Sequence, residues 1–261
     1  MSADPILCRI EDGVAVVTLN NLPMNVVTLE LTRRLDAVLD ALAADPAARV
    51  LVLTGAGERA FCAGSDIKEF PELAASGQVI DTKMRKENEV YSKVDDFPKP
   101  TIAAVTGVAY GGGLELAVCC DLIVVEEDAR LALPEVKLGV FPGSGGTVRV
   151  TRRIGEGRAK EMMFFGEPID ARTALAWGLI NRVVPKGEAL LTAGRMAAQL
   201  AELPNRALQI CKRAIDLSFD VSEDEAIRQT LPLSGEAFAT DDCQEGVRAF
   251  FEKRPPRFTH S

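Results

Sequence analysis

Two glutamates lie in apolar stretches of the sequence. Glu115 is flanked by Leu114 and Leu116, and Glu135 follows the segment LALP and precedes VKLGV. An apolar setting destabilises the charged form of a carboxyl group and raises its pKa, as proton transfer near neutral pH requires. We therefore predict that Glu115 and Glu135 are an acid/base pair. Two alternatives stay open: Glu115 on the solvent face of an amphipathic helix, and Glu135 in a first helical turn after Pro134, where negative charge is favoured.

Histidine, the residue that most often transfers protons, is nearly absent. The only histidine is the penultimate residue, His260. A histidine-activated nucleophile and a zinc site of the usual histidine-containing type therefore lack their central residue, and acid/base work falls on carboxylates, lysine or tyrosine. The cysteines show no CxxC spacing, and we interpret them as reduced, structural thiols. They are Cys8, Cys62, Cys119, Cys120, Cys211 and Cys243.

Three glycine-bearing loops follow apolar strands. Their sequences are AFCAGSDIKE (60–69), AYGGGLEL (109–116) and VFPGSGGT (140–147). In the second loop the glycines open a helix, whose first N–H groups are unpaired and suit an oxygen that becomes negative during a reaction. For each loop, the alternative is that glycine serves only a tight turn. A dinucleotide-binding turn after VLVLTGAG is a poor match, because Ala60 stands where the third glycine is required.

The first half of the chain contains the strands and helices that must position these residues. An Asp12-Gly13 turn between ILCRI and VAVVTL predicts a β-hairpin. Thr28 is expected to cap a helix that ends at Asp45-Pro46, because apolar residues recur between them at helical spacing. Further strands are predicted at 49–54, 101–110, 121–125 and 130–133, with a helix at 114–120. The polar segment 76–96 keeps helical periodicity and is expected to be a lid or pocket wall.

From residue 171 onward, helix predominates. ARTALAWG predicts a helix that ends at Gly178, LINRVV a short strand, and the chain after Lys186 mostly helix. The fold class is therefore α/β, with a helical last third. A chain of 261 residues can form one large core, or a core with a helical appendage.

Composition narrows the class of protein. The chain is 47% hydrophobic and 26% charged, as folded proteins are. Its 30 basic and 38 acidic residues give a net charge of −8, which disfavours nucleic acid as a partner. Polar residues and glycines interrupt the apolar region 102–125, so it is not expected to span a membrane. Nothing near the N-terminus resembles an export signal, and we expect a cytoplasmic protein.

With these motifs in view, the sequence resembles the crotonase superfamily, also called the enoyl-CoA hydratase/isomerase family. ERAFCAGSDIKEF is similar to its first oxyanion loop, KPTIAAVTGVAYGGGLELAVCCD to its second, and LPEVKLGVFPGSGGTVR to its catalytic stretch. AWGLINRVV and EGVRAFFEKRPPRF resemble its later segments. The resemblance implies a spiral of repeated ββα units over residues 1–202. It also implies a C-terminal helical region, 203–261, that packs between the subunits of a homotrimer or of a hexamer built as a dimer of trimers.

The resemblance also implies roles for individual residues. The N–H groups of Ser65 and Gly112 would polarise a thioester carbonyl. Glu115 and Glu135 would hold a water with the help of the Gly143 N–H, and Glu135 would supply the α-proton. The coenzyme A site would use the loop residues Ala63, Ser65, Asp66, Ile67 and Lys68. No metal or redox cofactor is implied, since coenzyme A is part of the substrate.

Three hypotheses about function remain at this point. The first is reversible syn hydration of a 2-enoyl-CoA, because both glutamates and both oxyanion loops are present. The second is another reaction of the family, namely isomerisation, a specialised dehydration or C–C cleavage. Tyr110 and Leu114, which flank the expected site, depart from the best-known hydratases and favour a specialised acyl group, whereas Ser65 in place of a frequent alanine should be harmless. The third is a coenzyme A-binding or scaffold protein without catalysis.

Overall fold

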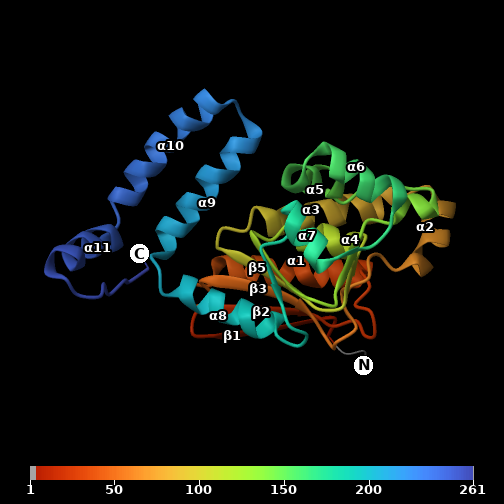
Figure 1. The fold of residues 1–261 in the computed structure, drawn as a ribbon, viewed down its shortest axis with the longest axis horizontal. Helices are drawn as coiled ribbons and strands as arrows, with labels where there is room; N and C mark the ends of the chain where they lie inside the picture. The colour runs from red at the N-terminus through yellow and green to blue at the C-terminus, as the bar shows by residue number, and fades with distance from the viewer. Residues whose placement is uncertain (1–3, 261) are drawn as a thin grey trace.

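The computed structural model describes residues 4–260, which form a six-stranded sheet, a smaller four-stranded sheet and the surrounding helices (Figure 1). The large sheet has the order β1-β2-β3-β5-β7-β10. β1 and β2 are antiparallel, and the other neighbours are parallel. The strands are β1 Ile6–Glu11, β2 Val14–Leu19, β3 Val50–Gly55, β5 Thr101–Val105, β7 Leu122–Glu126 and β10 Arg182–Val184. The predicted opening hairpin is confirmed, with Asp12 and Gly13 at positive φ in its turn.

The smaller sheet has the order β4-β6-β8-β9. Its strands are β4 Ala60–Cys62, β6 Val108–Tyr110, β8 Arg130–Ala132 and β9 Ile169–Asp170. The prediction of one strand over 101–110 was wrong, because β5 and β6 belong to different sheets. Gly107, between them, has φ +58°, and a Cβ there would lie 2.1 Å from the Arg59 carbonyl oxygen. This close approach turns the chain from one sheet to the other.

Helices cover both faces of the large sheet. Those of the first 201 residues are α1 Leu29–Ala44, α2 Phe70–Ser76, α3 Arg85–Asp95, α4 Gly112–Ala117, α5 Gly146–Ile154, α6 Glu156–Phe165, α7 Ala171–Trp177 and α8 Ala189–Ala201. Thr28 caps α1 as predicted, its side chain accepting from the Leu31 N–H. Gly178 ends α7 in the left-handed conformation. The helix predicted at 114–120 begins two residues earlier and ends at Ala117.

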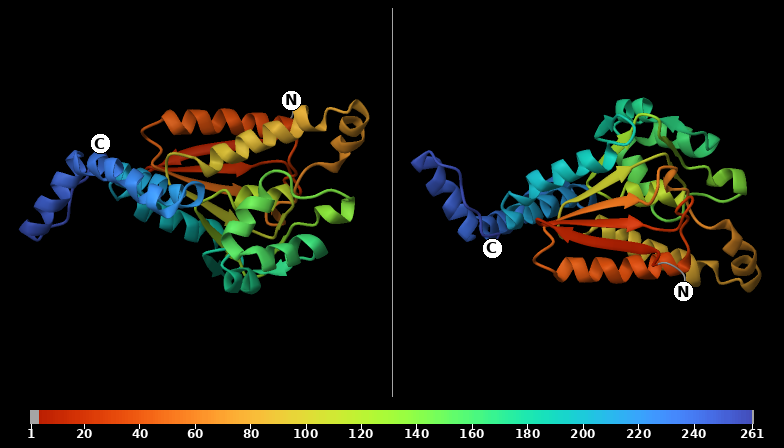
Figure 2. Two further views of the ribbon diagram at one scale, coloured as in Figure 1. Left: turned by 90° about the horizontal axis from the view of Figure 1, so that it is seen from above. Right: turned by 90° about the horizontal axis from the view of Figure 1, so that it is seen from below.

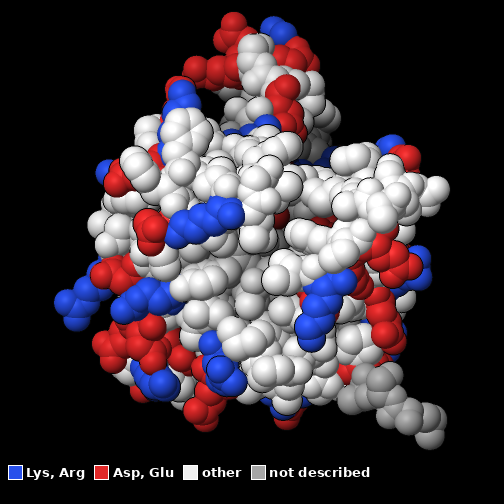
Figure 3. Space-filling model, turned by 90° about the vertical axis from the view of Figure 1, so that its right-hand side faces the viewer, with Lys and Arg blue, Asp and Glu red and all other residues white. Residues whose placement is uncertain are grey.

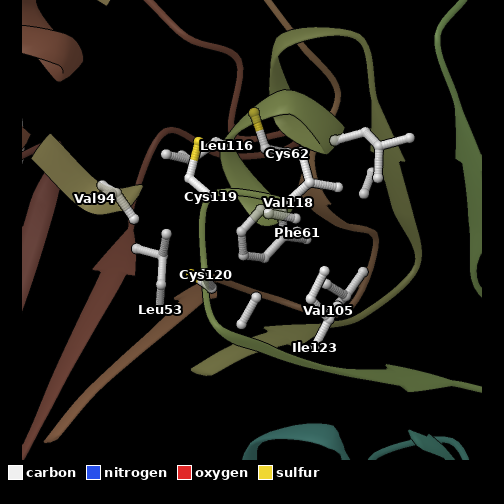
Figure 4. Close-up of a cluster of buried hydrophobic side chains, with 14 of the residues drawn as sticks. Leu53, Phe61, Cys62, Val94, Val105, Leu116, Val118, Cys119, Cys120 and Ile123 are labelled. Atoms are coloured by element: carbon white, nitrogen blue, oxygen red, sulfur yellow. The ribbon is translucent and has the colours of Figure 1, made fainter. Parts of the chain in front are cut away.

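The core has two parts, one on each face of the large sheet. Alanines of α8 pack on one face against Val50, Val52 and Ile102. On the opposite face α1, α3 and α4 pack against the sheet (Figure 2). Behind the glycine-bearing loops this core is lined by Phe61, Leu116 and neighbours that include three cysteines (Figure 4). The buried side chains of α4 thus pack against this core.

The six cysteines are free thiols, in agreement with the prediction of reduced cysteines. Cys62, Cys119 and Cys120 are buried, whereas Cys8 and Cys211 are exposed and do not pack in the core.

Three further helices, α9 Asn205–Asp220, α10 Glu223–Phe238 and α11 Asp241–Glu252, extend away from the sheets (Figure 1). They carry exposed apolar side chains. These are Ile215, Phe219, Ile227, Leu231, Phe238, Val247, Phe250 and Phe251. Within residues 4–260, no helix is long and apolar enough to cross a membrane.

Candidate active site

The carboxyl ends of three neighbouring strands form the site. β4, β6 and β8 are parallel, so their ends lie at one edge of the smaller sheet. The residues that follow them are Ala63–Ser65, Gly111–Gly112 and Leu133–Glu135. Segments far apart in the sequence are thereby brought together where ligands commonly bind in α/β proteins.

The two predicted oxyanion donors lie side by side. A Cβ on Gly112 would be 3.7 Å from the Ser65 nitrogen. Gly112 is the first residue of α4, where an N–H has no partner within its helix. Among the described residues, neither the Ser65 nor the Gly112 N–H has a protein acceptor. Two N–H groups without protein acceptors therefore lie close together, as an oxyanion hole requires.

The backbone conformation of this loop requires glycine. Gly111 has φ +51° and ψ −129°, which residues with a side chain rarely adopt. At Gly113 a Cβ would lie 2.1 Å from the Cys62 carbonyl oxygen. Tyr91, buried in α3, donates a hydrogen bond of 2.9 Å to the Gly112 carbonyl oxygen. These contacts fix the start of α4 against β4.

Glu115 is buried in α4, so the solvent-facing alternative is excluded. Its side chain is 3% exposed, and Oε1 accepts hydrogen bonds of 2.8 Å from the N–H groups of Ser144 and Gly146. Burial raises the pKa of Glu115 to about 7, assisted by the nearby charge of Glu135 and partly offset by the Gly146 hydrogen bond. In the part of the chain that the structure describes, Oε2 has no protein donor. That oxygen is free to bind a water.

Glu135 begins a 3₁₀ turn, Glu135–Leu138, directly after Pro134. The alternative of a first helical turn is therefore correct for its backbone, yet its side chain lines the same pocket as Glu115. Burial raises its pKa. Oε2 is buried without a hydrogen-bond partner in residues 4–260, and Oε1 would lie 2.9 Å from a Cβ on Gly111. An unpaired buried carboxyl oxygen is costly and is expected where a ligand completes the site.

A cavity of about 1110 Å³ joins the two glutamates to a largely apolar chamber. Its wall includes Phe70, Leu73, Val79, Ile80 and Met84, so the polar segment 76–96 is a pocket wall, as one of the two predictions had it. Phe70 and Leu73 belong to α2, and the others to the helical segment that leads into α3, which is π-helical over Ile80–Met84. Figure 3 shows this side of the molecule, whose middle is mostly uncharged. An acyl chain has the matching chemistry.

The structure distributes the predicted coenzyme A residues unevenly. Ala63, Ser65 and Ile67 line the cavity, whereas Asp66 and Lys68 are not part of its wall. The Asp66 carboxylate instead accepts from the Lys68 N–H, at 3.1 Å, and caps a short 3₁₀ turn. Gly143, the predicted water donor, does line the cavity, and its carbonyl oxygen accepts a 2.9 Å hydrogen bond from Asn88.

Sequence reasoning missed a buried charged group in the pocket wall. Lys83 and Glu87 are each 1% exposed and form an ion pair of 3.0 Å. The sequence did contain a signal, because Lys83, Glu87, Val90 and Val94 share one helical stripe. Two charges in an apolar stripe indicate a buried pair.

The sequence profile described as enoyl-CoA hydratase/isomerase matches residues 9–261. The chain belongs to the enoyl-CoA hydratase/isomerase family. The short-chain-enoyl-CoA hydratase of Clostridium acetobutylicum is 36% identical over 256 residues, which cover 97% of each chain. The crotonyl-CoA hydratase of Syntrophomonas wolfei is 34% identical over 267 aligned residues, covering 99% of each.

Solved structures of the family agree with this fold. The enoyl-CoA hydratase of Bacillus anthracis superposes with a TM-score of 0.93 at 34% identity, covering 98% of this chain and all of that one. The resemblance inferred from the motifs and the α/β fold expected from it are therefore confirmed.

Proposed function

We propose that the protein is an enoyl-CoA hydratase that adds water reversibly, with syn geometry, to a 2-enoyl-CoA and forms a 3-hydroxyacyl-CoA. The observation that carries this proposal is the presence of two buried carboxyl groups, Glu115 and Glu135, beside two free N–H donors in one pocket. Both named relatives of known substrate class are hydratases, which supports the same reaction.

The donors act on the thioester. The N–H groups of Ser65 and Gly112 bind its carbonyl oxygen and draw electron density toward it, which makes the β-carbon electrophilic. They bind the enolate oxygen more tightly than the ground-state carbonyl, and a donor of this kind is typically worth about 3 kcal/mol in barrier height. Because they are backbone groups, the serine side chain at position 65 does not alter this step.

The glutamates then divide the proton transfers. Ionised Glu115 accepts a proton from the water, whose oxygen bonds to the β-carbon, while protonated Glu135 gives its proton to the α-carbon. The Gly143 N–H helps to hold the water. Each raised pKa suits its residue to this exchange near neutral pH. Both carboxyl groups line one cavity, which supports the delivery of water and proton to the same face of the double bond.

Coenzyme A is the carrier part of the substrate in this proposal, and no metal or redox cofactor takes part. Its thioester end would lie against Ala63, Ser65 and Ile67. We propose that Asp66 and Lys68 act further out, on the nucleotide part, since they lie beside this loop but outside the cavity wall.

We also propose that α9 to α11, within the region 203–261, pack between subunits of a homotrimer or a dimer of trimers. The support is the row of exposed apolar side chains on these helices, of which Phe250 and Phe251 are 79% and 77% exposed. Aromatic side chains so exposed are expected to be covered in an assembly. The cytoplasmic location stays a prediction from the sequence.

The product formed from crotonyl-CoA tests the reaction type. A hydratase gives 3-hydroxybutyryl-CoA, identified by mass and NMR. An isomer of unchanged mass or a shortened acyl-CoA would replace the proposal with another reaction of the family. Binding of saturated and unsaturated acyl-CoA without turnover would indicate a non-catalytic protein.

A further inference from the structure

A third carboxyl group, Glu87 on α3, lies next to the acid/base pair. Its ion pair with Lys83 is almost completely buried, and Lys83 also lies 2.8 Å from Glu69. Burial lowers the pKa of Lys83, but the two carboxylates outweigh this effect and raise it, so the lysine is cationic. Removing charges from water costs several kcal/mol per ion, and apolar side chains usually fill such a wall with equal stability. Stability alone therefore does not explain the pair.

The oxygens of Glu87 contact both loops that serve the reaction. Oε1 accepts a hydrogen bond of 3.4 Å from the Ser65 hydroxyl, and Oε2 accepts one of 3.0 Å from the Ser144 hydroxyl. Ser65 supplies an oxyanion N–H, and the Ser144 N–H donates to Glu115 at 2.8 Å. One carboxylate thus connects the group that binds the thioester oxygen with the group that holds the base.

We propose that Glu87, with Lys83 as its counter-ion, is a positioning residue that fixes the Ser65 and Ser144 loops relative to each other and places a negative charge beside Glu115. This inference rests on the proposed hydratase function. Glu87 acts through its neighbours, not on the substrate.

The charge has a measurable consequence at Glu115. Burial and Glu135 raise the pKa of Glu115, and Glu87 adds to them in the same direction. The other titratable groups that face Glu115 are Tyr91 and Cys119, and burial raises both of their pKa values well above the ordinary range. These two are neutral near pH 7, so Glu87 and Glu135 are the neighbouring groups that raise the pKa of Glu115.

Glu87→Gln removes the charge and keeps the shape of the side chain. We expect the pKa of Glu115 to fall, so that the rising limb of the pH profile of hydration moves to lower pH. We also expect kcat to fall by up to about a hundredfold, as small misplacements in a site do, with little change in KM. Lys86→Gln is the matched control. Lys86 lies on α3, as Glu87 does, and forms a 2.6 Å ion pair with Asp36, but it is not part of the cavity wall.

The titration of Glu115 can be followed without turnover. Infrared difference spectra report the carboxyl band, and its loss in Glu115→Gln identifies the residue. If the carboxyl band titrates at a lower pH in Glu87→Gln than in wild type, but wild type has no hydratase activity, the hydratase proposal is refuted. The link between Glu87 and Glu115 then still stands. If wild type is active and the band titrates at the same pH in Glu87→Gln as in wild type, only the link between Glu87 and Glu115 is refuted.

A second variant guards against misfolding of the first. Lys83→Met/Glu87→Leu replaces both charges with apolar groups, and buried pairs treated in this way commonly keep their stability. We expect this double variant to unfold at no lower urea concentration than wild type and yet to lose activity as Glu87→Gln does. Either variant, folded and with the kcat, KM and pH profile of wild type, would overturn the proposal.

Discussion

Glu115→Gln should lower activity and raise the free energy of unfolding, and the gain in stability should depend on pH. The amide keeps an oxygen that can accept both N–H groups now bound to Glu115 Oε1, those of Ser144 and Gly146. It removes the charge whose burial raises the pKa. The ordinary pKa of 4.5 and the value of about 7 in the folded protein differ by about 2.5, and at 1.36 kcal/mol for each pKa unit this corresponds to about 3 kcal/mol.

The sign follows from proton binding. Between pH 4.5 and about 7 the folded protein holds a proton on Glu115 that the unfolded chain has lost, so the free energy of unfolding decreases as pH rises through this range. Above pH 7 the wild-type protein is destabilised by the buried charge of Glu115, whereas the glutamine variant has no charge at this position. We expect the variant to be more stable than wild type by up to about 3 kcal/mol at pH 8, with the difference vanishing near pH 4.5.

Urea denaturation at pH 5 and pH 8, at equal protomer concentration, measures both differences. The reasoning is refuted if the variant is destabilised at pH 8, or if its advantage is the same at both pH values. Glu126→Gln is a useful comparison, since Glu126 is a buried carboxyl group of β7 outside the cavity wall.

Three further outcomes are expected. The kcat/KM of hydration should rise with pH through about 7 as Glu115 loses its proton, and a flat profile between pH 5 and pH 9 would contradict its role as the base. Gly113→Ala should lower kcat by about a hundredfold or more, because its Cβ would lie 2.1 Å from the Cys62 carbonyl oxygen, whereas Gly194→Ala in α8, with nothing within 4 Å, should remain fully active. Phe250→Asp/Phe251→Asp should produce smaller particles in sedimentation velocity than wild type, and a monomeric wild type would exclude the proposed subunit contact.

Local sequence patterns predicted the elements that depend on neighbours in the chain. The Asp12-Gly13 turn, the Thr28 cap and the helix end at Gly178 each follow from the chemistry of a few adjacent residues. The burial of Glu115 was predicted correctly for a similar reason, since its flanking leucines require a buried helix.

Features that depend on contacts between residues far apart in the sequence were harder to predict. The chain turns at Gly107 because of its approach to Arg59, and no local pattern in 101–110 reveals a contact with that residue. The ion pair of Lys83 and Glu87 was detectable from helical spacing, but its link to Ser144, 57 residues beyond Glu87, was not. The packing of α3 against the loop before α5 brings these groups together, and this packing is a property of the whole fold.

The central claim is that Glu115 and Glu135 together add water to an enoyl thioester. The most direct test follows the loss of enoyl-thioester absorbance when crotonyl-CoA meets the wild-type protein, Glu115→Gln and Glu135→Gln, with butyryl-CoA affinity measured alongside by calorimetry. We predict rapid loss for wild type, rates lower by about two to four powers of ten for each variant, and nearly unchanged affinity. Unchanged turnover in either variant, or binding without turnover in wild type, would contradict the account.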